Sequence, residues 1–322
     1  MLKIGVIGAG HLGTIHIKCI LQIPNFKLVG FYDTDLSVRK NVSETFKIRS
    51  FESVDELFEA VDAVDIITPT TFHFYYASAA IRKLKHVFIE KPIVSLLKEA
   101  FLLTNLSLEA NVKVQVGHVE RLNPAFVAVK QQIRNPMFIE CHRLALYNPR
   151  GTDVSVVLDL MIHDIDIVLS VVKSPIKKID ANGAAVVSKT ADIANARIEF
   201  ENGAVANFTA NRISLKNMRR SRFFQQGAYI SIDFLEKKTE VFHLTDVDSG
   251  NIPTMQINTA EGEVKYIVKD TPEIKPTNAI QSELELFYQS IVNDSVPLVS
   301  VSDGSNALNV ADQIMNKIMV KS

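Results

Sequence analysis

The first group of residues that could do chemistry is a glycine-rich turn. Gly8, Gly10 and Gly13 directly follow the apolar run Leu2–Ile7, and Asp33 lies twenty residues beyond Gly13. Such a turn lets a pyrophosphate approach the backbone N–H groups that open a helix, and the acidic residue accepts hydrogen bonds from a ribose diol. The spacing predicts a dinucleotide site, with a merely structural glycine turn as the alternative. The expected cofactor contacts here are Gly8, Gly10, His11, Leu12, Gly13 and Asp33.

A second group of polar residues follows two later apolar runs. Thr68 and His73 come after the run that begins at Ala63, and Glu90 and Lys91 come after the run that begins at His86. Ligands of open α/β sheets bind outside the carboxyl ends of the strands, so we expect all four residues beside the cofactor. For His73, a place at the start of the next helix in a plain loop fits the sequence equally well.

The third group lies on one predicted helix. Asp159, His163 and Asp166 have the spacing i, i+4, i+7 and would share a narrow stripe on a helix that is otherwise apolar nearly all round. A buried helix with one polar stripe indicates that the stripe faces a polar pocket. The alternatives are a satisfied buried His–Asp pair or two metal ligands, and we expect no metal because the sequence offers no third ligand of matching spacing.

Composition limits the classes of partner. The 322 residues contain 35 Lys and Arg against 36 Asp and Glu, so no basic field would hold nucleic acid or an anionic membrane. No segment approaches the ~20 apolar residues of a membrane span. Cys19 and Cys141 have no metal-binding spacing and allow at most one disulfide, which favours a reducing, cytoplasmic setting.

The elements that must position these residues fall into two predicted domains, because a chain of this length exceeds one ordinary core. Up to about residue 117, short strands alternate with helices, which predicts a parallel sheet covered on both faces. The expected strands are Leu2–Ile7, Phe26–Tyr32, Ala63–Thr68, His86–Glu90 and Lys113–Gly117. The expected helices are His11–Ile23, one capped by Ser53, Phe72–Leu84 and Ser95–Ala110.

The second half of the chain is mainly strand-like after helices at Ala125–Ile133 and Ser155–Val171. Residues 204–211 alternate in polarity after a hairpin turn at Asn202-Gly203, as in a sheet with one dry face. The fold class is therefore α/β: a doubly wound Rossmann domain at residues 1–120, and an α+β domain with a large open, mostly antiparallel sheet at residues 121–322. We expect the last helix to pack back on the first domain. Burial of the open sheet's second face predicts a homodimer or homotetramer, with a solvated polar face as the alternative.

Together these motifs resemble the Gfo/Idh/MocA oxidoreductase family over essentially the whole chain. The marks are the glycine motif with His16 shortly after it, the Thr-Pro turn with His73, the triplet Glu90-Lys91-Pro92, and Asp159 followed by His163. The resemblance implies a Rossmann domain joined to an open sheet that often mediates oligomerisation. It also implies that Lys91 borders nicotinamide and substrate, that His163 is the acid/base, and that Asp159 binds or orients the substrate.

Within that family, residues 117–125 are similar to a segment of the members that oxidise UDP-N-acetylglucosamine, although Leu122 replaces their usual phenylalanine. The stretch Asn211 to Asp233 is similar to the same subgroup. A nucleotide sugar is therefore the expected substrate class. Arg121 follows the last Rossmann strand and is expected to contact the substrate, whereas the basic residues Lys216, Arg219, Arg220 and Arg222 fit a diphosphate site or a solvated strand edge equally well.

The expected reaction is hydride transfer between the nicotinamide and a secondary alcohol or ketone. His163 would take the hydroxyl proton, and Lys91 would stabilise the developing alkoxide. The Asp33 carboxylate disfavours a 2′-phosphate, so NAD is expected, with NADP as the alternative because Arg39 partly offsets that charge. Two other functions stay open: a reductase of a non-sugar carbonyl or conjugated substrate, and a dinucleotide-sensing regulator without catalysis. The sensor would need neither Lys91 nor His163.

Overall fold

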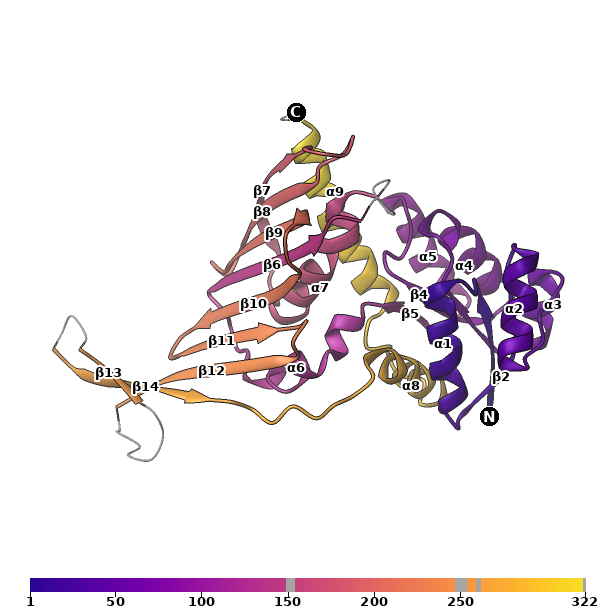
Figure 1. Ribbon diagram of the computed structural model, residues 1–322, viewed down its shortest axis with the longest axis horizontal. Helices are drawn as coiled ribbons and strands as arrows, with labels where there is room; N and C mark the ends of the chain where they lie inside the picture. The colour runs from indigo at the N-terminus through magenta and orange to yellow at the C-terminus, as the bar shows by residue number, and fades with distance from the viewer. Residues whose placement is uncertain (149–153, 247–253, 259–261, 321–322) are drawn as a thin grey trace. The chain divides into compact units, whose positions relative to one another are not determined.

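The computed structural model describes residues 1–148, 154–246, 254–258 and 262–320. Two compact units make up the chain (Figure 1). Unit 1 contains residues 1–119 and 278–309, and unit 2 contains residues 120–277 and 310–322. The carboxyl-terminal segment is thus divided between the units, and each unit is described by itself below.

Unit 1 is built on a five-stranded parallel sheet with the strand order β2-β1-β3-β4-β5. The order reverses between β1 and β3, which is the switch point where ligands of doubly wound sheets bind. The predicted parallel sheet is confirmed, with small differences at the strand ends. The strands are β1 (Leu2–Ile7), β2 (Phe26–Tyr32), β3 (Ala63–Ile66), β4 (His86–Glu90) and β5 (Val114–Gly117).

Unit 1 also contains helices. They are α1 (His11–Gln22), α2 (Leu36–Phe46), α3 (Val54–Ala60), the 3₁₀ turn η1 (Thr70–Phe72), α4 (His73–Arg82), α5 (Leu97–Glu109), α8 (Ala279–Val292) and α9 (Val301–Val320), whose last part belongs to unit 2. Ser53 caps α3 as predicted, since its side chain accepts the Glu56 N–H. Helix α2 was not predicted, because only Val42 of it is buried and its apolar pattern is weak. Asp35 nevertheless caps it by accepting the N–H groups of Ser37 and Val38.

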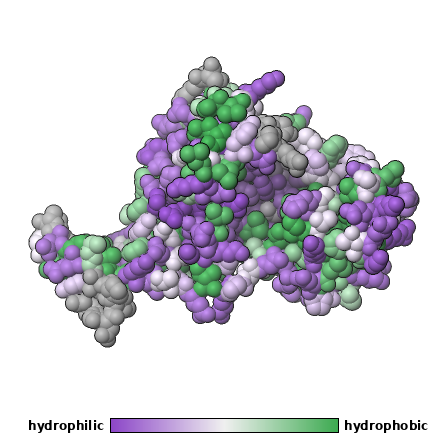
Figure 2. Space-filling view, viewed as in Figure 1, coloured by the Kyte–Doolittle hydropathy of each residue, from purple (hydrophilic) through white to green (hydrophobic). Residues whose placement is uncertain are grey.

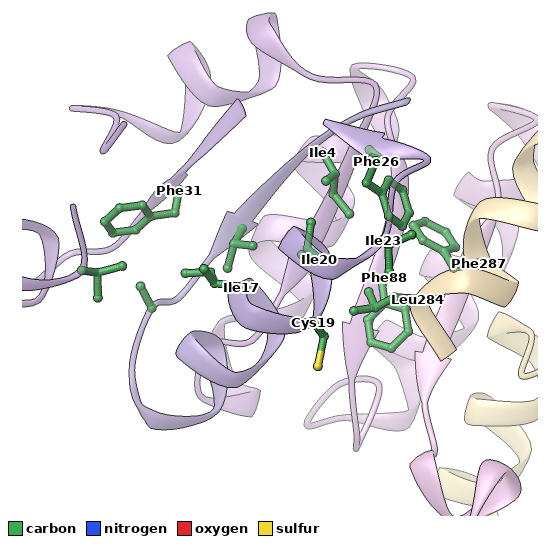
Figure 3. Packing of buried hydrophobic residues seen from close by; sticks show 14 residues of the cluster. Ile4, Ile17, Cys19, Ile20, Ile23, Phe26, Phe31, Phe88, Leu284 and Phe287 are labelled. Atoms are coloured by element: carbon green, nitrogen blue, oxygen red, sulfur yellow. The ribbon is translucent and has the colours of Figure 1, made fainter. Parts of the chain in front are cut away.

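The core of unit 1 joins segments from both ends of the chain (Figure 3). Ile17 and Ile20 of α1 pack with Phe88 of β4 and with Leu284 and Phe287 of α8. Each of these five side chains is at most 1% exposed, so their burial removes almost all of their apolar surface from water. Helix α8 is therefore an integral part of unit 1.

Unit 2 is built on a nine-stranded sheet with the order β13-β14-β12-β11-β10-β6-β9-β8-β7. Only the β6–β9 pair of this sheet is parallel, so the predicted open, mostly antiparallel sheet is confirmed. The strands are β6 (Phe138–Leu146), β7 (Ile176–Ala184), β8 (Ile193–Phe200), β9 (Val205–Ser214), β10 (Met218–Gln225), β11 (Ala228–Asp233), β12 (Lys238–Thr245), β13 (Thr254–Asn258) and β14 (Val264–Asp270).

Alternation on β9 follows the prediction: Ala206, Phe208 and Ala210 are buried, and the residues between them are partly exposed. Gly203 has φ +86°, a left-handed conformation that suits the predicted hairpin turn. No helix in the described part of the chain combines the length and hydrophobicity needed to cross a membrane.

Two helix predictions in unit 2 need correction. The expected helix Ala125–Ile133 is instead a short α6 (Pro124–Val127) followed by a 3₁₀ turn η3 (Lys130–Gln132). The N–H groups of Val129 and Gln132 bond three residues back, which tightens the chain and ends the α-helix. The expected helix Ser155–Val171 begins as a π-helix, η4 (Val157–Met161), and continues as α7 (Ile162–Val171).

Candidate active site

The glycine turn has the geometry that its sequence predicts. Gly8 has φ +91°, and a Cβ there would lie 2.6 Å from the Ile67 carbonyl oxygen. A Cβ on Gly13 would lie 2.1 Å from the Gly8 carbonyl oxygen, so the turn and α1 pack too closely for any other residue. At Gly10 a Cβ would meet nothing within 4 Å, and Gly10 starts α1 without a side-chain cap. The space beside Gly10 at the start of α1 is therefore open, as a pyrophosphate site requires.

A groove of about 240 Å³ lies beside this turn in unit 1. It is lined by Ile7, Gly8, Gly10, Tyr32, Asp33, Thr34, Ile67, Thr68, Pro69, Phe72 and Tyr76. The Asp33 carboxylate is fixed by the turn itself, because Oδ2 accepts the Ala9 N–H at 2.7 Å and Oδ1 accepts the Asp35 N–H at 2.9 Å. The Thr68 hydroxyl is buried, and none of the described residues offers it a hydrogen-bond partner. An acidic ribose acceptor, an open helix start and an unused hydroxyl together fit an adenine dinucleotide.

The other predicted cofactor residues near the turn differ in exposure. His11 and Leu12 are exposed in the first turn of α1. His73 is 1% exposed, and its two ring nitrogens lie 2.9 Å from the carbonyl oxygens of Thr68 and Pro92. Burial lowers the pKa of His73, although both carbonyl oxygens favour a proton on the ring. His73 thus ties the turn after β3 to the turn after β4.

Glu90 ends β4 with its carboxylate turned into unit 1. One oxygen lies 3.3 Å from His16 Nε2, and the other accepts the N–H of Lys91 at 3.1 Å. The Glu90 side chain thus holds the backbone of Lys91, and its predicted contact with the cofactor stays a prediction. Lys91 itself is half-buried at the carboxyl end of β4, and its bond to Pro92 is cis.

Asp159 and His163 are half-buried residues of unit 2, in η4 and in the first turn of α7. The predicted stripe also includes Asp166, which lies three residues after His163 in α7. Asp166 is 1% exposed and binds Arg121, with Nε–Oδ2 at 2.8 Å and Nη2–Oδ1 at 2.6 Å.

This bidentate pair gives Arg121 a structural role. Its guanidinium is 7% exposed and uses two of its N–H groups on Asp166, so it anchors α7, and its contact with the substrate stays a prediction. Of the predicted basic group, Arg220 pairs with Asp233 at 2.9 Å and Arg222 with Glu140 at 3.4 Å. These pairs favour the interpretation of the basic group as a solvated strand edge over that of a diphosphate site.

A second arginine holds the opposite side of α7. Arg143 of β6 contacts Asp164 with two nitrogens, at 2.8 Å and 3.1 Å, and Glu120 Oε1 at 2.9 Å. Burial would lower the pKa of the Arg143 guanidinium, but the two carboxylates outweigh it and raise that pKa. Asp164 and Asp166 are two residues apart and point to different sides, so α7 is fixed from two directions beside His163.

The sequence analysis missed Arg143, Asp164 and Glu120, and also a similar pair further along β9. There, Arg212 donates to Asp192 at 3.0 Å and to the Val154 carbonyl oxygen at 2.6 Å. A usable signal was present. Arg143 follows buried Ile139 and Cys141 at two-residue steps, and Arg212 continues the buried face of β9. A charged residue on the dry face of a strand requires a buried partner.

Among the described residues, no group of three or more His, Cys, Asp or Glu side chains could hold a metal ion.

Comparison with known proteins decides the family. A model described as "Oxidoreductase family, NAD-binding Rossmann fold" matches residues 2–118, and one described as "GFO/IDH/MocA C-terminal domain" matches residues 137–229. The chain belongs to the Gfo/Idh/MocA oxidoreductase family. As a member of that family, it is an NAD-dependent oxidoreductase, as the glycine turn and Asp33 predicted.

Several relatives in this family resemble the chain over nearly its full length. A UDP-N-acetylglucosamine 3-dehydrogenase of Acidithiobacillus ferrooxidans is 33% identical over 90% of this chain and 88% of its own. A solved structure of that enzyme has a TM-score of 0.90 at 32% identity, covering 98% of this chain and 97% of its own. A scyllo-inositol 2-dehydrogenase (NAD(+)) of Bacillus subtilis is 25% identical over 96% of this chain and 92% of its own.

Proposed function

We propose that this chain oxidises a ring hydroxyl of a nucleotide sugar with NAD⁺, and that UDP-N-acetylglucosamine is its substrate. The observation that carries the proposal is the similarity to the UDP-N-acetylglucosamine 3-dehydrogenase, which extends through both units at 33% identity. The presence of Lys91, Asp159 and His163 supports a catalytic protein over a dinucleotide sensor, because binding alone needs none of them.

His163 is the proposed general base. Oxidation of a secondary alcohol removes the hydroxyl proton as hydride leaves the same carbon. An imidazole ordinarily titrates near pH ~6.5, so its neutral form is available at neutral pH to take that proton. Asp159 lies one turn earlier and would hold a neighbouring sugar hydroxyl or orient the ring. Arg121 and Arg143 contribute indirectly, since both fix the helix that carries His163.

Lys91 is the proposed electrostatic partner of the reacting oxygen. Its ammonium group would donate a hydrogen bond to the alcohol and stabilise the alkoxide charge that develops as the proton leaves. NAD⁺ supplies the hydride acceptor. Gly8, Gly10, Gly13, Asp33 and Thr68 would hold it, as argued from the groove in unit 1. The same groups serve the reverse reaction, so a keto-sugar would be reduced by NADH.

A substrate panel tests the proposal. Purified protein is mixed with NAD⁺ or NADP⁺ and with UDP-N-acetylglucosamine, UDP-glucose, free N-acetylglucosamine, glucose 6-phosphate or scyllo-inositol, and nicotinamide fluorescence is followed. We expect the highest kcat/KM with UDP-N-acetylglucosamine and NAD⁺. Turnover restricted to free sugars, inositols or a non-sugar carbonyl would overturn the nucleotide-sugar assignment. Dinucleotide binding without turnover of any of them would favour the sensor.

Matched variants test the two catalytic roles. Lys91→Met and His163→Asn should each lower kcat by about 10²- to 10⁴-fold, the usual contribution of a positioned acid/base group, and leave NAD affinity nearly unchanged. Lys98→Met and His142→Asn remove the same side-chain types from sites outside the proposed machinery and should keep wild-type kcat. Wild-type kcat in Lys91→Met or His163→Asn would contradict the assignment.

The open sheet of unit 2 supports a proposed homo-oligomer. Its face away from the buried residues carries a row of stacked rings, Phe224 on Tyr229 (centroids 4.8 Å apart) and Tyr229 on Phe242 (5.4 Å). A cavity of about 640 Å³ lies over this row and over Met255 of β13, and Figure 2 shows hydrophobic surface on β13 and β14. Exposed apolar surface of this extent is typical of a protein interface.

The test of that interface is the mass in solution. Light scattering should give a dimer or tetramer for the wild-type chain, and Tyr229→Glu should lower the mass. Leu108→Glu places the same charge on an exposed residue of unit 1 and should leave the mass unchanged. A monomeric wild-type chain would contradict the proposal.

A further inference from the structure

Three titratable side chains meet inside the core of unit 1. His16 of α1 lies between Asp65 of β3 and Glu90 of β4, with Nδ1 2.9 Å from Asp65 Oδ2 and Nε2 3.3 Å from Glu90 Oε1. The His16 and Asp65 side chains are 0% exposed, and the Glu90 side chain is 12% exposed. The edge of the imidazole packs against Phe88, with ring centroids 5.9 Å apart. The proposed chemistry uses neither His16 nor Asp65, so this cluster needs a reason of its own.

Burial of two carboxylates is costly unless a cation accompanies them. Burial by itself disfavours a charged imidazole, but Asp65 and then Glu90 outweigh it, so the pKa of His16 lies well above its usual 6.5. Burial also opposes the ionised form of Glu90, yet His16 and Lys91 hold the Glu90 pKa below its ordinary value. A charged His16 ring between two ionised carboxylates, Glu90 and Asp65, is therefore the consistent charge state. Burial raises the pKa of Asp65, and the contact with His16 opposes that rise.

The cluster ends at the backbone of Lys91. The Glu90 oxygen that does not face His16 accepts the Lys91 N–H at 3.1 Å. On the neighbouring strand, Gly117 leaves the room that this carboxylate needs, since a Cβ there would lie 2.8 Å from Glu90 Oε1. His16, Glu90 and the Lys91 backbone thus form a continuous series of contacts from the middle of α1 to the carboxyl end of β4.

We infer that His16 is a positioning residue for Lys91: as an imidazolium held between Asp65 and Glu90, it fixes the Glu90 carboxylate that holds the Lys91 N–H. The inference rests on the proposed function in one respect, that Lys91 acts on the substrate. A histidine that only fills the core would satisfy the packing against Phe88 equally well. The charge on the ring and the effect on Lys91 distinguish the two roles.

The first test is the protonation state of His16 in the full-length protein. Histidine-selective ¹⁵N labelling and comparison with the His16→Gln spectrum assign the His16 ring nitrogens, which are followed from pH 6 to pH 9. The groups that face the cluster are Asp65, Glu90, Lys91 and the Cys19 thiol, with His73 nearby through Glu90. We expect the imidazolium pattern at neutral pH, and in Glu90→Gln a titration moved to lower pH. A neutral His16 ring at pH 7 would overturn the inference.

The second test is the effect on Lys91. His16→Gln should lower kcat with UDP-N-acetylglucosamine by about 10- to 100-fold, the scale of a small misplacement of a reacting group, and leave NAD affinity largely intact. Ile20→Val also weakens the core on α1 but leaves the cluster untouched, and should keep wild-type kcat. If the two variants lose activity only in proportion to their loss of thermal stability, the role of His16 is structural and the inference fails.

A third readout separates this inference from the proposed function. The rate of reductive methylation of Lys91, measured by peptide mass spectrometry relative to the exposed Lys27, reports the environment of the amine without any substrate. His16→Gln should change that ratio severalfold, and Ile20→Val should not. If the wild-type protein turns over no sugar, the proposed function fails. The methylation ratio and the protonation state of the His16 ring then still decide the role of His16. An unchanged ratio in His16→Gln would contradict the inference.

Discussion

The contact between Arg121 and Asp166 gives a prediction that separates a structural role from substrate binding. Both guanidinium–carboxylate bonds are short, 2.8 Å and 2.6 Å, and the side chains are 7% and 1% exposed. Arg121→Met removes the cation and leaves the Asp166 carboxylate buried without it. Removal of one partner of a buried pair costs about 3–5 kcal/mol, because the remaining buried charge loses its ion-pair partner.

The magnitude can be converted to a thermal shift. For a unit of roughly 150–250 residues, each kcal/mol lowers the midpoint by about 2–4 °C, so Arg121→Met should lower the Tm of unit 2 by about 6–20 °C. Replacing both partners, as Arg121→Met with Asp166→Leu, removes the uncompensated charge and should recover most of that loss. The double-mutant cycle therefore measures the coupling of the two side chains.

The assay combines calorimetry with steady-state kinetics well below the lowered midpoint. If Arg121 anchors α7, the double variant regains stability and most of its kcat, and KM for the nucleotide sugar stays close to wild type throughout. If Arg121 binds the substrate, KM rises in both the single and the double variant and stability changes little. The second pattern would refute the assignment of Arg121 to the support of α7.

Three further predictions concern the cofactor turn and the clamp at Asp192. Gly13→Ala places a Cβ 2.1 Å from the Gly8 carbonyl oxygen and should weaken NAD binding, measured by titration calorimetry, by about 100-fold or more; wild-type affinity would contradict the turn geometry. Asp33→Asn keeps an acceptor for the Ala9 N–H but loses the charge that disfavours a 2′-phosphate, so the NAD-to-NADP ratio of kcat/KM should fall by about tenfold; an unchanged ratio would contradict that role. Although burial raises it, hydrogen bonds from the backbone N–H groups of Val186, Val187 and Ser188 hold the pKa of Asp192 well below its ordinary value. The stability that the ionised Asp192 adds is present above pH ~4 and is lost as the pH falls toward the pKa of the folded protein. The difference in Tm between wild type and Asp192→Asn should therefore narrow from about pH 5 to about pH 2. A constant difference in Tm would show that the charge is not responsible.

The sequence predicted the cofactor half of the fold closely because its signals are local. The turn at Gly8 needs a positive φ, and the approach of α1 to that turn excludes a side chain at Gly13. Both demands act within a few residues and leave a fixed spacing in the sequence. The alternation along β9 and the turn at Gly203 are local in the same sense.

The support of the catalytic helix could not be predicted in the same way, because it depends on contacts between distant segments. Arg121 meets Asp166 across 45 positions, and Arg143 meets Asp164 across 21. The π-helix at Val157–Met161 was also not predicted, because the apolar spacing of this segment fits a regular helix. A charged residue at a buried step of a strand, such as Arg143, signals that a partner exists but does not identify it.

The networks around Lys91 and His163 share one feature: each proposed catalytic side chain is next to buried charges that fix its segment. Glu90 and His16 hold the backbone at Lys91, while Arg121 and Arg143 bind the two carboxylates that follow His163 on α7. Side chains that position a reacting group must themselves be locked by their neighbours. Substitutions in these networks should therefore change kcat more than NAD affinity.

The proposed reaction passes a hydride directly from a ring carbon of the nucleotide sugar to NAD⁺. The most direct measurement uses UDP-N-acetylglucosamine carrying deuterium at C3, with mass analysis of the nicotinamide product. We predict deuterated NADH from the wild-type enzyme, and about 10²- to 10⁴-fold slower formation of the same product by Lys91→Met and His163→Asn. NADH without deuterium, or no NADH from this substrate, would contradict the proposed reaction.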